Sequence, residues 1–136
     1  MSHISRFVSR GKLGRSRVVL LLLAAIVATP AYAFFHAILR SAVPAAGATV
    51  AESPRELRLT FSEAIELPFT RITVLAGGRD TVVMGRAAHD SSANQIVVVP
   101  VTSALKPGSY TVKYRVAGHD GHPMGGSYVF TVGGKK

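Results

Sequence analysis

Three observations in the sequence predict an all-β domain built as a sandwich or small barrel. After residue 34 the apolar residues recur with a period of two over short runs, and no helical period of useful length appears. Clusters of Gly, Pro, Asn, Ser and Asp separate these runs at regular spacing. Finally, Tyr110 follows a Pro-Gly turn at the start of the sixth run. Greek-key sandwiches place a tyrosine corner there, although an ordinary buried tyrosine is the alternative.

The first three of seven predicted strands lie at residues 36–41, 57–62 and 71–74. The second run alternates Leu and Phe with Arg, Thr and Ser, and the third alternates Ile and Val with Arg and Thr. Because successive side chains on a strand point to opposite faces, each run predicts one buried and one exposed face.

The last four predicted strands are residues 81–84, 95–99, 110–116 and 128–132. The first of them is a short apolar run. The second is dominated by consecutive Ile and Val, which indicates a central strand or one buried on both faces. The third alternates Tyr and Val with Thr, Lys and Arg, and the last carries two aromatic residues and valines. One domain of residues 34–136 accommodates all seven strands.

Residues 1–33 have the organisation of a cleaved secretory signal peptide. Five basic residues precede an unbroken apolar run at 18–27, which is short for a membrane-spanning helix. Ala31-Tyr32-Ala33 has the small-x-small form of a signal peptidase site. We therefore expect export to the periplasm, with an uncleaved N-terminal anchor as the alternative.

Charge and cysteine content narrow the function further. The chain has a formal charge of +9, but residues 34–136 hold eleven basic and seven acidic residues, a charge of only +4. With no basic stripe interleaved with aromatic residues, the sequence does not predict nucleic-acid binding. There is no cysteine, so the fold depends on its core, and a metal site would need nitrogen, oxygen or thioether ligands.

The stretch 118–126 concentrates the chemistry of the chain. It places two imidazoles, a carboxylate and a thioether between the last two predicted strands. Asp-Gly and Pro give this stretch tight turn chemistry. The Asp120-x-His122 triplet on a rigid turn can present two donor groups to one metal ion. A solvated polar loop is the alternative reading.

Strand alternation favours the metal site. In an antiparallel succession the connections alternate between the two ends of the sandwich. The end where the first strand begins then receives His36, the 62–68 connection with Glu63 and Glu66, and the 85–94 connection with His89. The 118–126 loop lies at the same end. Every histidine after residue 33 is therefore predicted at one end.

Several segments in order resemble the CopC/PcoC family of periplasmic copper-binding proteins. They are residues 36–47, 57–63, 105–112, 120–123 and 126–132. The resemblance covers nearly all of residues 34–136. It implies a seven-stranded Greek-key fold, immunoglobulin-like or cupredoxin-like, and a Cu(II) site.

The resemblance also implies the ligands of that site. They are His36, Asp120 and His122, with Glu63 nearby as a weak ligand or as a partner of the ligands. His119 precedes Asp120, and adjacent residues point in opposite directions. We therefore expect His119 at the rim, with a ligand role as the alternative.

Two departures from the family matter. The connection at 76–80 lacks the methionines that hold Cu(I) in some members, so we expect no independent Cu(I) site. Met84 is expected in the core, while Met124 could pack or make a weak axial contact. In addition, cleavage after Ala33 would leave two phenylalanines before His36. The metal would then take the amine, intervening amides and imidazole together, or the imidazole alone.

These observations predict a periplasmic Cu(II) carrier or buffer in copper homeostasis and resistance. No catalytic residues are assigned, and we expect no enzyme activity. The expected partners are the copper ion and either an inner-membrane copper transporter or another periplasmic copper protein. The alternatives are a histidine-brace copper oxidase or mono-oxygenase and a metal-free interaction module.

Overall fold

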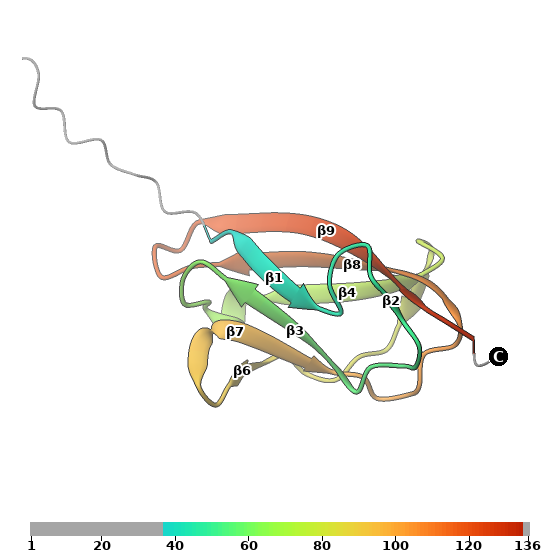
Figure 1. The fold of residues 1–136 in the computed structure, drawn as a ribbon. Helices are drawn as coiled ribbons and strands as arrows, with labels where there is room; N and C mark the ends of the chain where they lie inside the picture. The colour runs from blue at the N-terminus through green and yellow to red at the C-terminus, as the bar shows by residue number, and fades with distance from the viewer. Residues whose placement is uncertain (1–36, 135–136) are drawn as a thin grey trace, which may run out of the picture. The chain divides into compact units, whose positions relative to one another are not determined.

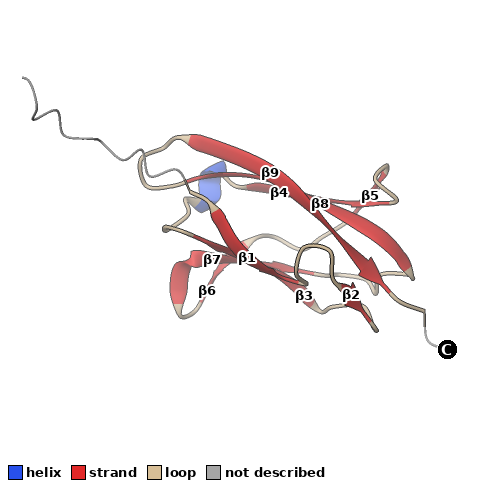
Figure 2. Cartoon of the chain, turned by 45° about the horizontal axis from the view of Figure 1, so that its top comes forward, coloured by secondary structure: helices blue, strands red, loops and turns tan. Residues whose placement is uncertain are grey.

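The computed structural model describes residues 37–134, which form two β-sheets packed face to face (Figure 2). One sheet has the strand order β1-β3-β7-β6 and the other β2-β9-β8-β4-β5 (Figure 1). The strands are β1 (Leu39–Val43), β2 (Thr49–Val50), β3 (Glu56–Phe61), β4 (Arg71–Ala76), β5 (Asp80–Val82), β6 (Ala88–Asp90), β7 (Ala93–Pro100), β8 (Gly108–Ala117) and β9 (Pro123–Val132). A single 3-10 turn, η2 (Leu67–Phe69), precedes β4.

The prediction of an all-β sandwich is confirmed, with nine strands in the described range instead of seven. The two missed strands are short and irregular. β2 has two residues and pairs in parallel with the end of β9, and β6 joins β7 through a shifted register. Neither offers a run long enough to show a period of two.

The predicted signal segment and His36 lie outside the described residues. The first predicted strand, 36–41, is found at 39–43. No helix in the described range is long and apolar enough to cross a membrane.

The core follows the predicted alternation. In β3 the residues Leu57, Leu59 and Phe61 are at most 1 % exposed, while the residues between them are half-buried. Strand β7 lies between β3 and β6, which confirms its predicted central position. Fully buried side chains from both sheets meet between the layers: Phe61, Phe130, Leu57, Leu59, Ile65, Val74, Val97, Val99, Val112 and Val116.

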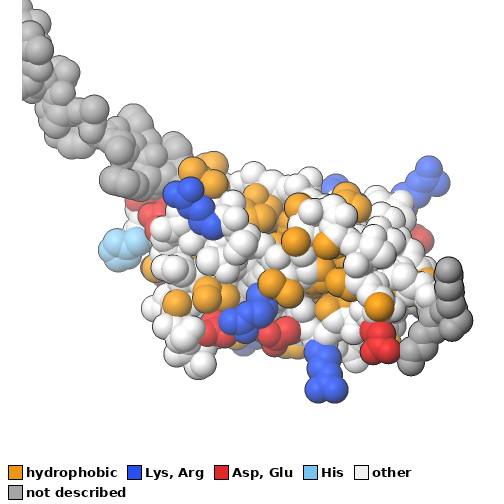
Figure 3. All heavy atoms as spheres, in the orientation of Figure 1, with side chains coloured by type: hydrophobic (Ala, Val, Ile, Leu, Met, Phe, Trp, Pro, Cys, Tyr) orange, Lys and Arg blue, Asp and Glu red, His pale blue; other side chains and the backbone are white. Residues whose placement is uncertain are grey.

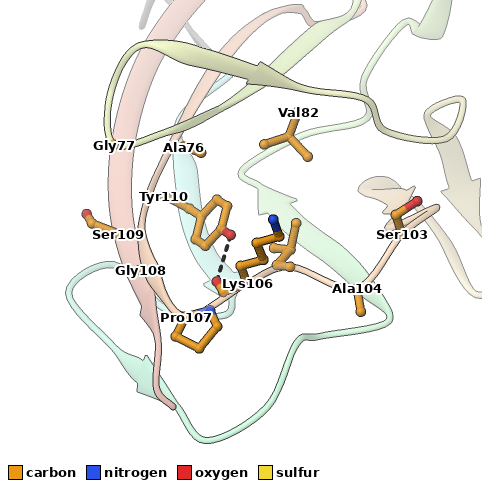
Figure 4. Close-up of a pocket in the computed structure, with 11 residues that line it drawn as sticks. Ala76, Gly77, Val82, Ser103, Ala104, Lys106, Pro107, Gly108, Ser109 and Tyr110 are labelled. Atoms are coloured by element: carbon orange, nitrogen blue, oxygen red, sulfur yellow. Dashed lines mark hydrogen bonds between the residues drawn. The ribbon is translucent and has the colours of Figure 1, made fainter.

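β8 and β9 form one long hairpin that runs from one end of the sandwich to the other. Their register begins with Gly108 opposite Val132 and ends with Ala117 opposite Pro123. At the first end the Tyr110 hydroxyl donates to the Lys106 carbonyl at 2.7 Å, which confirms the tyrosine corner (Figure 4). At the other end lies the loop that the sequence marks as the metal site.

Candidate metal site

The loop between β8 and β9 is a tight turn held by its own polar groups. The backbone N–H of His122 donates to Asp120 Oδ1 at 3.0 Å, and the Gly121 N–H donates to the Gly118 carbonyl at 3.0 Å. Gly121 has a φ of 75°, in the left-handed region that glycine adopts at no steric cost. The Asp-Gly pair therefore fixes the backbone between the two predicted ligands.

The side chains of Asp120 and His122 face each other. His122 Nδ1 lies 3.1 Å from Asp120 Oδ2. Ligands at right angles around a metal with bonds of about 2.0–2.1 Å lie roughly 2.8–3.0 Å apart. The spacing of this pair thus suits either a shared proton or adjacent positions on one metal ion. A single nitrogen–oxygen pair of this kind matches what Cu(II) prefers.

Glu63 brings a third polar group to this end of the molecule. Its Oε1 is buried, and within the described part of the chain it has no hydrogen-bond partner. The carboxylate lies against Gly118, where a Cβ atom would collide with Oε1. A buried carboxylate oxygen without a donor is costly, so this position favours a cation or an added N–H donor.

Hydrogen bonds made by the backbone and by the Ser62 side chain hold the segment that carries Glu63 in place. Ser62 N–H donates to the Ile38 carbonyl at 2.8 Å, and Ile38 N–H donates to Ser62 Oγ at 2.9 Å. Ile65 pairs with Gly118 through an isolated bridge. The described domain therefore begins with the buried Ala37 and the exposed Ile38, and Ile38 bonds to Ser62, the residue before Glu63. This start of the described domain lies directly after the predicted ligand His36.

The other two histidines have different surroundings. His89 Nε2 donates to the Ile65 carbonyl at 2.7 Å, so this ring braces the Glu63 segment. The side chain of His119 is 94 % exposed, and its Nδ1 lies 3.6 Å from Glu66 Oε1. That distance exceeds a hydrogen bond. The His119 side chain thus faces solvent near Glu66, and its place at the rim of the metal site stays a prediction.

At the end of the sandwich that carries the β8–β9 loop, histidine and acidic side chains lie next to each other, whereas other acidic side chains are spread over the rest of the visible face (Figure 3). Within residues 37–134, however, no three His, Asp or Glu side chains form a complete metal-binding group. The structure supplies the Asp120–His122 pair, and Glu63 lies against Gly118, two residues before Asp120. The third predicted ligand, His36, is not among the described residues. Met124 pairs with Val116 and packs against the core, as Met84 does.

Sequence reasoning missed two residues that shape the site. Gly118 leaves the space that the Glu63 carboxylate fills, and Ser62 ties the Glu63 segment to Ile38, the residue before β1. The signal for Gly118 was a second glycine in the 118–122 loop, which already had the turn-forming Asp120-Gly121 pair. Ser62 gave no such signal, because its partner is 24 residues away.

Comparison with known proteins gives one consistent answer. The model of the CopC domain matches residues 39–133. The chain is 33 % identical to protein YobA of Escherichia coli K12 over 116 residues, covering 85 % of this chain and 93 % of YobA.

Two solved structures share the fold. The crystal structure of CopC from Methylosinus trichosporium OB3b has a TM-score of 0.69 and 34 % identity, covering 74 % of this chain and 97 % of that one. PcoC, a methionine-rich copper resistance protein from Escherichia coli, has a TM-score of 0.65 and 30 % identity, covering 71 % and 98 %. By family model, sequence and fold, the chain belongs to the CopC family.

Proposed function

We propose that this protein is a periplasmic Cu(II)-binding carrier or buffer that acts in copper homeostasis and resistance. Relatives of the chain include copper resistance proteins. The observation that carries the proposal is the Asp120–His122 pair, with 3.1 Å between Oδ2 and Nδ1. The loop that holds this pair begins at Gly118, against which lies the buried carboxylate of Glu63, and the Oε1 of Glu63 has no hydrogen-bond partner within the described residues. Asp120 and His122 would hold the ion together with His36, and Glu63 would accept a hydrogen bond from a ligand or bind weakly.

The exposure of the pair suits a carrier. The His122 side chain is 66 % exposed and that of Asp120 38 %. An acceptor protein could therefore approach the ion and replace these ligands one at a time. A buried site would need the loop to open first. The proposed partners are a copper transporter of the inner membrane or another periplasmic copper protein.

A Cu(II) titration followed by visible absorption and electron paramagnetic resonance tests the proposal. We expect one Cu(II) per chain. The His122→Ala variant should bind at least about tenfold more weakly, because it loses a nitrogen ligand. Unchanged affinity in this variant would remove the loop from the site.

His119→Ala is the matched control, since it removes an imidazole three residues away in the same loop. It should leave the Cu(II) spectrum unchanged. Loss of a nitrogen ligand in this variant would mean that the loop bends to bring both rings to the metal.

We further propose that the protein is not an enzyme and has no independent Cu(I) site. Oxidation of a polysaccharide by the copper-loaded protein with ascorbate or peroxide would contradict the first statement. Stoichiometric Cu(I) uptake that survives loss of His36, His119 and His122 would contradict the second.

A further inference from the structure

Three cations lie on the outer face of the five-stranded sheet. In β4 and β8 the alternate residues Val74, Val112 and Val116 are buried in the core. Arg71, Lys113 and Arg115 therefore project from the opposite face, where all three are exposed. The register sets Arg71 directly opposite Arg115, and Lys113 lies two residues before Arg115 in β8. We call Arg71, Lys113 and Arg115 the basic face.

Within residues 37–134, no carboxylate lies within 4.0 Å of any cation of the basic face. The outward positions of β4, β8 and β9 also hold no acidic residue; apart from the three cations they are Thr, Ser, Gly, Pro and apolar residues. Like charges directly opposite on neighbouring strands destabilise a sheet. Repulsion between these cations therefore destabilises the fold, and no carboxylate of the described residues offsets it.

In the other sheet, Arg58 has two acidic partners. Arg58 on β3 lies 3.1 Å from Glu56 and 2.6 Å from Asp90. The two carboxylates raise the pKa of Arg58 from its ordinary value, with the Asp90 hydrogen bond as the larger cause. An arginine with an internal partner is thus available in this domain, and the basic face lacks one.

The basic face lies toward the end of the sandwich that carries the β8–β9 loop, which we call the metal end. Arg115 is three residues before Gly118, and Arg71 follows η2, whose Phe69 is 68 % exposed. The η2 turn is joined to β8 by a hydrogen bond from the N–H of Glu66, the residue before η2, to the Ala117 carbonyl at 2.9 Å. Arginine and exposed aromatic residues are enriched at protein interfaces.

From this placement we propose that the basic face docks an acidic surface of the protein that exchanges copper with the Asp120–His122 pair. The identity of this partner rests on the proposed copper function. Complementary charge would steer the partner toward the metal end and set its orientation. A lipid surface fits less well, because membrane recognition by charge uses clusters of four to eight basic residues.

Nuclear magnetic resonance titration of the full chain with an acetylated hexaglutamate peptide tests this inference, and a hexaglutamine peptide gives the baseline. We expect shifts confined to β4, β8 and η2 that fade with added salt. The double variant Arg71→Gln/Arg115→Gln should weaken binding about three- to tenfold. The exposed Arg79 lies in the turn at the far end of β4, so Arg79→Gln is the matched control and should change nothing.

Other outcomes would overturn the inference. Equal weakening by Arg79→Gln would show a general charge effect. If the double variant abolishes binding to vesicles of phosphatidylglycerol and phosphatidylcholine but does not change peptide binding, the basic face binds lipid.

Each single variant should also raise the midpoint of chemical denaturation, and a lower midpoint would give the cations a structural role. Cu(II) titration of the same variants separates the two proposals, since localised peptide binding without copper binding would leave only the docking surface standing.

Discussion

The two ends of the β8–β9 hairpin use polar groups in opposite ways. At the tyrosine corner, the Tyr110 hydroxyl is satisfied by the Lys106 carbonyl, and the depression around it, about 380 Å³, is lined mostly by apolar residues (Figure 4). At the metal end, Glu63 Oε1 is buried without a partner in the described domain, and the Asp120–His122 pair faces solvent. At the first end the polar group is satisfied within the fold, whereas the second end offers polar groups that a ligand could bind. Four changes test this contrast.

The largest effect, that on Cu(II) binding, is expected for Gly118→Ala. The new Cβ would collide with the Glu63 carboxylate and force it out of its position. Because the displaced group is the end of a flexible side chain, we expect a loss of at most about 1 kcal/mol of unfolding free energy, together with clearly weaker Cu(II) binding. Chemical denaturation and Cu(II) titration measure the two effects.

The control for Gly118→Ala is the double variant Gly118→Ala/Glu63→Ala. Removing the carboxylate should recover most of the lost stability but not the copper affinity. Additive losses in the double variant would show that the two residues do not interact.

At the opposite end, Tyr110→Phe removes only the hydroxyl of the tyrosine corner. The Lys106 carbonyl loses its donor, so we expect about 1 kcal/mol of destabilisation. Cu(II) affinity should stay the same, because the corner lies at the other end of β8. A change in the copper spectrum of this variant would mean that the two ends are coupled through the hairpin.

Tyr128→Phe removes a hydroxyl that, unlike the hydroxyl of Tyr110, has no hydrogen-bond partner in the described domain. The Tyr128 hydroxyl is buried and has no partner in the described domain, and burial, followed by the neighbouring Tyr114, raises the pKa of Tyr128 to about 12. Removing an unsatisfied hydroxyl should leave stability unchanged or raise it by up to about 1 kcal/mol. Destabilisation in thermal unfolding would show that this hydroxyl has a partner in solution.

The smallest effect concerns acid stability. Hydrogen bonds from Ser92, followed by Arg58, lower the pKa of Asp90 to about 2 from an ordinary 3.8. Between these values the unfolded chain binds more protons at this residue than the folded chain does. The Asp90 contribution is therefore complete above about pH 4 and is lost as the pH falls toward 2. Asp90→Asn should flatten the stability–pH curve in this window, and an unchanged slope would contradict the assignment.

Much of the fold could be predicted because its cause is local. Alternation in β3 and β8 and the Pro-Gly turn before Tyr110 reflect the geometry of single strands and turns. The strands β2 and β6 escaped prediction because pairing with distant partners defines them. The same division holds at the site. The Asp120–His122 spacing follows from a turn, whereas the contact between Glu63 and Gly118 joins residues 55 positions apart and could be seen only in the folded domain.

The predicted ligands Asp120 and His122 lie in one hairpin, which has a consequence for the order in which the site forms. Asp120 and His122 are brought together by the turn between β8 and β9, whose residues are close in sequence and meet on the timescale of microseconds. Glu63 reaches Gly118 only after β3 packs across the sandwich, a contact that must first overcome the entropy of closing a long loop. A chain that is still folding would therefore present a pair of candidate ligands before its sandwich is complete. Copper captured at this stage would stabilise the hairpin early and favour the remaining steps of folding.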